Sequence, residues 1–165
     1  MINKRKGLIF DLDQTLVDSS ALEILRKDRD WYQVKKNVHK IKVFEGITEL
    51  IEYAKLKDYV LGIVTNLPSM ICDLYIEKAA LDIKIRICYH DTRYHKPNPE
   101  PVLLAIERMG INQELSYGVG NDISDILAYN SAGIKSIFAK WSSFPAPEES
   151  SHIANNPLDL KNIIE

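Results

Sequence analysis

The sequence predicts an α/β protein built on a parallel β-sheet. Short runs rich in β-branched and apolar residues alternate along the chain with segments whose apolar residues recur at helical spacing. The runs are almost continuously apolar, which is typical of strands buried on both faces. Alternation of such strands with helices favours a sheet covered by helices on both sides. We therefore expect a Rossmann-like sheet of about five strands, with a small helical cap inserted after the first strand.

The five expected strands share short length, apolar character and a turn or polar residue at each end. The first is followed by acidic residues, and the fourth is interrupted only by glycine, which leaves the apolar pattern intact. The five runs are Gly7–Leu12, Tyr59–Val64, Ile83–Tyr89, Ser116–Val119 and Lys135–Ala139.

The expected helices are recognised by apolar spacing and by residues typical of helix ends. In the first of them, Ile47, Leu50, Ile51 and Ala54 recur at the spacing of one helical face. The others extend over Ser69–Leu81, from Asn98-Pro99 to Met109 with Gly110 at the end, over Asp122–Ala132 before Gly133, and over Leu158–Ile164. The segment from Trp141 to Asn156, rich in Ser, Pro and Glu, is expected to be a surface connection.

The segment from residue 18 to 43 does not fit a simple crossover between strands. Ser20 and Glu23 have the spacing of a capping box, so a helix is expected to begin there. Trp31, Val34, Val38 and Ile41 then recur at helical spacing. We interpret residues 18–43 as a small helical cap, and residues 1–17 and 44–165 as the α/β core.

The cap segment is strongly basic. Between Arg26 and Lys42 it holds seven basic residues against two acids, a local excess of five positive charges. Such an excess can steer an anionic ligand toward a cleft. The alternative is a solvated helix face whose apolar side packs on the core, and the sequence leaves both interpretations open.

Composition excludes several classes of protein. The chain has 165 residues, of which 45% are hydrophobic and 27% charged, values of an ordinary globular domain rather than of a disordered chain. The net charge of −2 argues against a globally basic nucleic-acid binder, so no nucleic-acid partner is expected. No apolar run approaches the roughly 20 residues of a membrane helix, so no membrane association is expected.

Two features suggest a cytoplasmic location. The apolar stretch near the N-terminus stops at Asp11, which makes it too short for a secretory signal. Cys72 and Cys88 lie in apolar surroundings, and we expect two buried, reduced thiols.

Two acids follow the first expected strand at alternate positions. Asp11 and Asp13 would share a direction if the chain is extended, and the carboxyl ends of parallel strands line the binding crevice of open α/β sheets. Two carboxylates held close together repel, so they require a metal ion or a proton between them. The alternative is a solvated turn in which an Asp caps a helix.

Two further segments could hold an anion. Thr65 and Asn66 follow the second strand, where a hydroxyl and an amide can donate hydrogen bonds. Lys96 precedes an expected helix, so its ammonium and the helix N-terminus could hold a phosphate together. The alternatives are a simple helix cap and a surface lysine.

The fourth strand is also followed by polar and acidic residues. Asn121, Asp122 and Asp125 supply amide and carboxylate oxygens, which suit a hard cation such as Mg²⁺. Asp122 is expected to have the better claim to direct ligation because it is nearer the strand end than Asp125. Asp125 could act through a water or by holding Lys96. The alternative is that Asp122 caps the helix and Asp125 favours its first turn.

All these residues fall at the expected carboxyl ends of strands, which a parallel sheet brings to one edge. An acid pair, a hydroxyl donor, a lysine and metal-binding oxygens together suit phosphoryl transfer. The segments resemble the four motifs of the haloacid dehalogenase-like (HAD) superfamily, in the branch similar to phosphoglycolate phosphatases. The matching segments are Asp11-Leu12-Asp13-Gln14-Thr15-Leu16, Thr65-Asn66, Lys96-Pro97-Asn98-Pro99-Glu100-Pro101 and Gly120-Asn121-Asp122-Ile123-Ser124-Asp125.

The resemblance implies a Mg²⁺-dependent phosphatase that acts on a small anionic phosphate ester. Asp11 would be the nucleophile that becomes an aspartyl phosphate, and Asp13 the general acid and base. The Asp11 carboxylate and the Asp13 carbonyl would bind Mg²⁺. Phosphate oxygens would be held by Thr65, the Asn66 backbone and Lys96, whose charge would also offset that of the nucleophile.

The chain departs from the family pattern at two residues and in the length of the cap. Gln14 stands where the family usually has Gly, and Asn121 stands where it usually has a metal-binding Asp. Three rival interpretations follow: an inactive HAD-fold binding protein, suggested by Asn121; a phosphomutase; and a phosphoacceptor module of the response-regulator receiver type. The position of Lys96 before the Gly-Val-Gly strand argues against the last, and the oligomeric state stays open.

Overall fold

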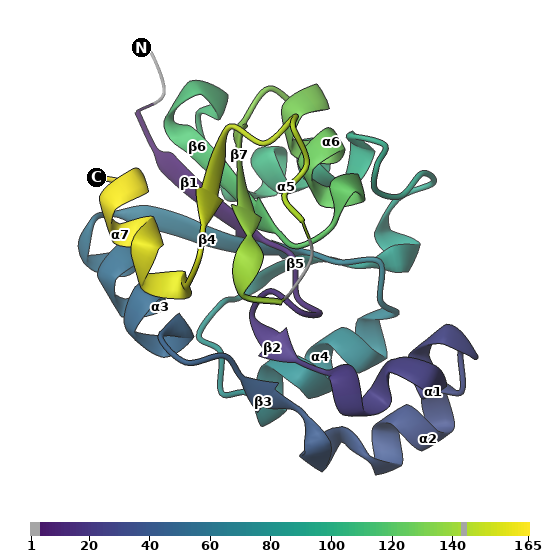
Figure 1. Ribbon diagram of the computed structural model, residues 1–165. Coiled ribbons are helices and arrows are strands. Elements are labelled where there is room, and N and C mark those ends of the chain that lie inside the picture. The colour runs from purple at the N-terminus through teal and green to yellow at the C-terminus, as the bar shows by residue number, and fades with distance from the viewer. Residues whose placement is uncertain (1–3, 143–144) are drawn as a thin grey trace.

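The computed structural model describes residues 4–142 and 145–165. Residues 1–3 and 143–144, which belong to the expected core, lie outside the described residues. Six parallel strands form one sheet in the order β5-β4-β1-β6-β7-β8, which confirms the predicted fold class (Figure 1). The strands are β1 Lys6–Phe10, β4 Tyr59–Val64, β5 Ile85–Ile87, β6 Ser116–Gly120, β7 Lys135–Ala139 and β8 His152–Ala154.

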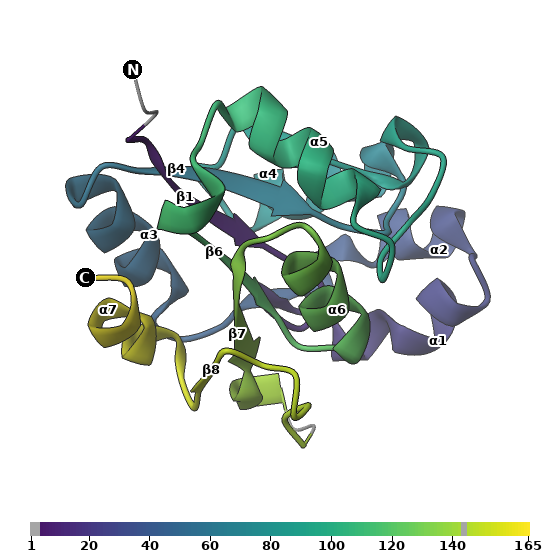
Figure 2. The ribbon, with the colours of Figure 1, turned by 90° about the horizontal axis from the view of Figure 1, so that it is seen from above.

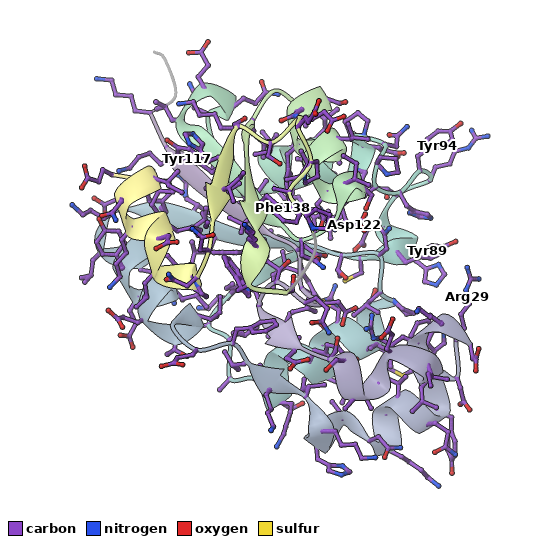
Figure 3. The ribbon with its side chains drawn as sticks, in the orientation of Figure 1. Arg29, Tyr89, Tyr94, Tyr117, Asp122 and Phe138 are labelled. Carbon is purple, nitrogen blue, oxygen red and sulfur yellow. The ribbon has the colours of Figure 1, made fainter. Side chains whose placement is uncertain are left out.

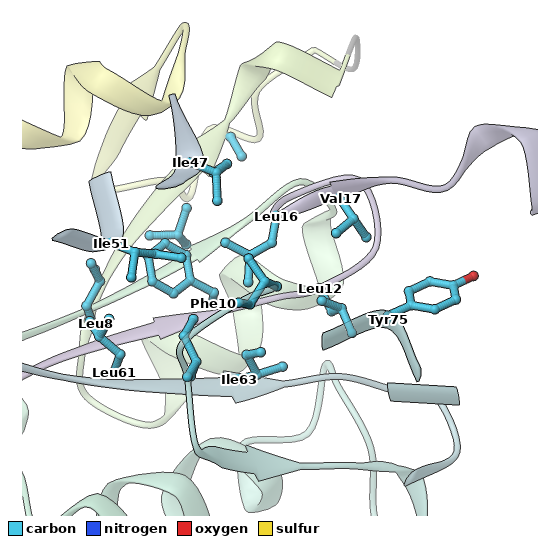
Figure 4. Close-up of a cluster of buried hydrophobic side chains, with 14 of the residues drawn as sticks. Leu8, Phe10, Leu12, Leu16, Val17, Ile47, Ile51, Leu61, Ile63 and Tyr75 are labelled. Carbon is cyan, nitrogen blue, oxygen red and sulfur yellow. The ribbon is translucent and has the colours of Figure 1, made fainter. Parts of the chain in front are cut away.

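The sheet is buried on both faces because successive residues of its central strand point in opposite directions. Leu8 and Phe10 of β1 contribute to one hydrophobic cluster, and Ile9 contributes to the cluster on the other face. Figure 4 shows the first cluster, where β1 side chains meet Ile47 and Ile51. This double burial explains why the expected strands are almost continuously apolar.

Helices cover both faces, as Figure 2 shows for α3 and α5 on either side of β1 and β4. The cluster of Leu8 and Phe10 includes residues of α3, α4 and α7, and the cluster of Ile9 includes residues of α5 and α6. Their bounds are α3 Ile47–Leu56, α4 Ser69–Lys78, α5 Glu100–Met109, α6 Ile123–Ser131 and α7 Leu160–Ile163. No helix in the described ranges is long and apolar enough to cross a membrane.

The strands differ from expectation in three main details. The third strand extends only over Ile85–Ile87 instead of Ile83–Tyr89. The first strand ends at Phe10 instead of Leu12, because the chain turns back and the amides of Leu16 and Val17 donate to the Leu12 carbonyl at 3.1 and 3.2 Å. The segment from Trp141 to Asn156 is more than a surface connection, since it contributes β8 at the sheet edge. Only Ala154 of β8 is buried, so the apolar pattern of a strand is missing there.

Residues 18–43 form short helices between two paired strands, at the bottom of Figure 1. Val17–Asp18 (β2) pairs antiparallel with Lys42–Val43 (β3). Between them lie α1 Glu23–Lys27 and α2 Trp31–Lys36, with 3-10 turns at Ser20–Leu22 and Val38–Lys40. The capping box expected at Ser20 is wrong, because the Ser20 amide and hydroxyl both donate to Asp18 Oδ1, at 3.0 and 2.6 Å.

The apolar side of this segment packs inward. Val34 and Ile41 are buried in the cluster that contains Leu8, and Trp31 and Val38 pack against it. Lys35 and Lys36 are exposed on α2. The two cysteines are free and buried, as expected.

Candidate active site

The carboxyl ends of three central strands deliver polar residues to one cavity of about 350 Å³. Asp11 follows β1, Thr65 follows β4 and Asn121 follows β6. After β1 and β4 the backbone hydrogen bonding of the sheet continues for one more residue. The Asp11 amide donates to the Val119 carbonyl (2.8 Å), and the Thr65 amide donates to the Ile87 carbonyl (3.0 Å). The cavity is lined by Asp11, Asp13, Gln14, Glu23, Arg26, Lys27, Trp31, Thr65, Asn66, Leu67, Lys96, Asn121, Asp122, Ser124 and Asp125. All eight residues selected from the sequence are among them.

Lys96 is the central cation of the site. Its Nζ donates to Asp11 Oδ1 (2.9 Å), to Asp125 Oδ1 (2.6 Å) and to the Val64 carbonyl (2.9 Å), which uses all three of its protons. The side chain is only 3% exposed. Burial alone would lower the lysine pKa, but the two carboxylates raise it, so the side chain stays charged. Lys96 is therefore no free surface lysine and fixes the orientation of Asp11.

Asp125 holds this lysine from the other side. Its Oδ2 accepts hydrogen bonds from the amides of Asn121 (3.1 Å) and Asp122 (3.2 Å), so it also fixes the turn after β6. Burial and the Asp11 charge raise its pKa to about 7, against the opposing effect of Lys96. With both oxygens occupied, Asp125 is placed to position Lys96 and the turn.

This packing leaves no room for a side chain at Gly120. A Cβ built there would lie 2.3 Å from the Asp125 Cβ, far inside van der Waals contact. We expect Gly120→Ala to lower the free energy of unfolding by about 1–3 kcal/mol, measured by chemical denaturation. Gly62→Ala is a matched control, because the Cβ there meets only the flexible Met109 side chain. An equal loss in both variants would contradict the expectation.

Asp13 faces the cap segment. It accepts a hydrogen bond from Ser19 Oγ at 2.5 Å and forms an ion pair with Arg26 Nη1 at 3.3 Å. Burial raises the pKa of Asp13, and Arg26 and Ser19 oppose that rise. The next residue, Gln14, has a φ of +62°, a left-handed conformation that glycine adopts without strain. The left-handed conformation explains why the family that this segment resembles usually has glycine at the position of Gln14.

Asn121 lies beside two oxygens of the first motif. The end of its amide is 3.1 Å from Asp11 Oδ2 and 3.2 Å from the Asp13 carbonyl oxygen. With nitrogen at that end, the amide donates to both; with oxygen at that end, three acceptors converge and a cation would hold them together. Oxygens next to each other on octahedral Mg²⁺ are about 3 Å apart, so this donor set fits Mg²⁺.

The charges of the site also suit a cation. Two buried carboxyl groups, those of Asp11 and Asp125, and the half-buried one of Asp13 form ion pairs with two cationic side chains of the described residues, Lys96 and Arg26. Burial raises the pKa of each carboxyl, and the Asp13 charge raises that of Asp11 further. Among the described residues no three His, Cys, Asp or Glu side chains cluster as metal ligands, so a cation here would depend on carbonyl and amide oxygens as well.

The structure separates Asn121 from Asp122. Asn121 is buried and faces Asp11, whereas Asp122 is exposed and accepts a hydrogen bond from the Ser124 amide at 2.8 Å, capping α6 (Figure 3). The expectation that Asp122 has the better claim to direct ligation therefore disagrees with the geometry. The alternative helix-cap interpretation describes Asp122, because its carboxylate serves the first turn of α6.

The anion-binding candidates differ in exposure. Thr65 is buried, and its Oγ1 accepts a hydrogen bond from the Leu67 amide at 3.2 Å, which leaves the hydroxyl proton available to a ligand. Asn66 is exposed at the cavity rim. Sequence reasoning missed Ser19 and Thr15, whose Oγ1 donates to Asp11 Oδ2 at 3.3 Å, and it counted Arg26 only as one basic residue of the cap.

Comparison with known proteins gives the family. The model of the haloacid dehalogenase-like hydrolase family matches residues 23–139, so the chain belongs to this family. The matched region begins after Asp11 and Asp13. Within it, the relatives place the chain among the phosphoric monoester hydrolases of the phosphoglycolate-phosphatase-like branch.

Two relatives illustrate the likeness. The N-acetylmuramic acid 6-phosphate phosphatase of Pseudomonas putida is 26% identical over 157 residues, covering 90% of this chain and 70% of the relative. The phosphoglycolate phosphatase of Escherichia coli is 32% identical over 130 residues, covering 76% of this chain. The matched region spans only 51% of the Escherichia coli enzyme.

Solved structures share the fold. A predicted phosphoglycolate phosphatase from Haemophilus somnus superimposes with a TM-score of 0.85 at 19% identity, over 100% of both chains. A HAD phosphatase from Thermococcus onnurineus gives a TM-score of 0.84 at 19% identity, over 96% of this chain and 97% of that one.

Proposed function

We propose that the protein hydrolyses a small phosphate monoester in two steps. The observation that carries the proposal is the buried Asp11 carboxylate, held by Lys96 at 2.9 Å and facing the same cavity as Asp13. Thr65 would donate a hydrogen bond to a phosphate oxygen. Lys96, whose three protons are taken by protein acceptors, would act on the phosphate through its positive charge, which would stabilise the charge that develops on the oxygens.

In the first step Asp11 would attack phosphorus while the bond to the ester oxygen breaks. Asp13 would give its proton to the departing oxygen, which leaves as an alcohol. In the second step Asp13 would take a proton from water, whose oxygen attacks the phosphorus of the aspartyl phosphate. Inorganic phosphate leaves, and the Asp11 carboxylate is restored.

The residues that would hold Mg²⁺ are Asp11, the Asp13 carbonyl and Asn121, with Asp125 acting through Lys96 and the turn after β6. When bound, the ion would supply positive charge that draws phosphate and carboxylate together against their repulsion. Of the two neighbouring residues after β6, Asn121 would bind Mg²⁺ directly, whereas Asp122 caps α6.

The test is a turnover screen at millimolar Mg²⁺, with and without chelator. Phosphoglycolate and N-acetylmuramic acid 6-phosphate, taken from the names of the relatives, come first, followed by sugar phosphates and nucleotides. We expect chelator-sensitive phosphate release and a phosphorylated protein after acid quenching. Absence of turnover on every ester would favour the inactive binding protein instead.

The choice of ligand gives a metal prediction. Asn121→Asp adds a carboxylate charge beside Asp11 and should lower the Mg²⁺ concentration for half-maximal activity by about tenfold or more. Isothermal titration should show the same direction in the absence of substrate. Asp122→Asn is the control and should leave Mg²⁺ binding unchanged; a larger effect at Asp122 than at Asn121 would restore Asp122 as the ligand.

A further inference from the structure

The chain that follows β7 reaches the site from outside the catalytic cavity. β7 ends at Ala139, and the cavity lining in the described ranges includes no residue of β7 or of the 3-10 turn after it, Lys140–Ser142. Trp141 lies in that 3-10 turn, and its indole Nε1 donates a hydrogen bond to the Thr15 carbonyl at 3.0 Å. This bond connects the segment after β7 to the turn of residues 11–16, which carries the proposed nucleophile.

The turn of residues 11–16 is weakly held by its own hydrogen bonds at Thr15. The amides of residues 15–17 all donate to the Leu12 carbonyl, and the Thr15 amide is the most distant of the three, at 3.4 Å. Gln14 adds strain, because its φ of +62° is unfavourable for a residue other than glycine. The bond from Trp141 therefore fixes a peptide that the turn alone holds loosely.

Thr15 connects this bond to the nucleophile. Its side chain is fully buried, and its Oγ1 donates to Asp11 Oδ2 at 3.3 Å and lies 3.4 Å from the side-chain amide of Asn121. Lys96 holds the other carboxylate oxygen of Asp11, Oδ1, at 2.9 Å. Each oxygen of the carboxylate therefore has its own donor, and the donor to Oδ2 belongs to the residue whose carbonyl Trp141 binds.

The position of the Trp141 donor is determined by packing. The half-buried indole packs against the hydrophobic cluster that contains Leu8 and Phe10. An indole is rigid and has a single N–H donor, so packing of the ring also fixes the direction of that N–H. The core of the protein thereby sets the place of the Thr15 peptide.

We propose that Trp141 is a positioning residue for the nucleophile. Its indole holds the Thr15 peptide, and through the Thr15 hydroxyl it sets the orientation of the Asp11 carboxylate for attack on phosphorus. Trp141 is not among the residues that line the catalytic cavity, so it acts on the chemical step without contacting a substrate held there. This inference rests on the proposed phosphatase function and extends the site to a residue outside the cavity.

The test is the steady-state kinetics of Trp141→Phe on the best ester of the turnover screen. Phenylalanine keeps an aromatic ring against the core and removes the N–H donor. We expect kcat to fall by about 5- to 20-fold and KM to stay within about twofold of the wild type, because orientation of the carboxylate is lost while the groups that bind phosphate remain.

A double-mutant cycle tests whether Trp141 acts through Thr15. Thr15→Val removes the hydroxyl and should lower kcat by a similar factor, whereas Thr15→Ser keeps the hydroxyl and should retain most of the wild-type kcat. In the Thr15→Val background, Trp141→Phe should change kcat by less than about twofold, because the link to Asp11 is already broken. A general loss of stability would not produce this dependence of one substitution on the other.

Tyr53→Phe is the matched control. It also removes the donor of a half-buried aromatic side chain to a backbone carbonyl, that of Lys161 at 3.2 Å, but outside the catalytic cavity, and it should leave kcat within about twofold. Wild-type kcat in Trp141→Phe, or an equal effect of that substitution with and without the Thr15 hydroxyl, would overturn the positioning role while the phosphatase stands. If the wild type hydrolyses no ester, the phosphatase proposal falls, and the inference falls with it.

Discussion

Replacing Asp11 with asparagine is expected to reduce phosphate release by at least about 10⁴-fold and to remove the phosphorylated protein seen after acid quenching. The amide is a poor nucleophile, and no other carboxylate occupies its place: Asp125 has both oxygens engaged by Lys96 and by backbone amides. Asp13 faces Ser19 and Arg26 instead. Steady-state kinetics and mass analysis of the quenched protein provide the two measurements.

The matched control for this variant is Asp122→Asn, which makes the same chemical change at the end of a neighbouring strand. Asp122 is exposed and caps α6, so its replacement should leave turnover within a few-fold of the wild type. Wild-type turnover in Asp11→Asn would exclude Asp11 as the nucleophile, whatever the control shows.

Replacing Lys96 with methionine is expected to cost both stability and activity. Two buried carboxyl groups, Asp11 and Asp125, would lose the cation that lies within 2.9 Å of each. Breaking a buried pair in this way costs about 3–5 kcal/mol of unfolding free energy. Turnover should fall by at least about 10³-fold, because the phosphate would then meet an uncompensated carboxylate.

A second variant separates the two losses. In Lys96→Met with Asp125→Asn, one of the stranded charges is gone, so part of the stability should return while turnover stays low. Lys55→Met is the control for removing a lysine, because Lys55 pairs with Asp82 at the exposed surface, where an ion pair contributes little to stability. If Lys96→Met is no less stable than Lys55→Met, the electrostatic account of the site is wrong.

Much of the sheet could be predicted because strands buried on both faces are apolar at nearly every position. The runs at Tyr59–Val64 and Lys135–Ala139 match the observed strands at both ends. β8 could not be predicted in this way, since an edge strand with one buried residue has no apolar pattern. The capping box at Ser20 failed because Asp18 lies two residues away and accepts the hydrogen bonds of Ser20 instead.

The site was predicted as a set of residues, because strand ends determine which segments meet. The sequence could not decide between Asn121 and Asp122, since one step along a turn reverses which side chain points inward. Lys96 was expected at the phosphate and near the nucleophile, and holding Lys96 was one of two roles open to Asp125. In the structure Lys96 donates hydrogen bonds to both Asp11 and Asp125. The sequence could not single out Arg26 from the seven basic residues of the cap segment, because its contact with Asp13 depends on the folded structure.

The pairing of Val17–Asp18 with Lys42–Val43 has a consequence for how such a protein can be altered. Because β2 and β3 pair with each other, the two ends of the intervening segment stay close together. The entropy of closing a loop grows slowly, by about 0.6 kcal/mol for each doubling of its length. The insertion is therefore a natural place for exchange: a longer or differently charged segment could be grafted between β2 and β3 if it keeps the contacts of Ser19 and Arg26 with Asp13 and the buried Val34 and Ile41.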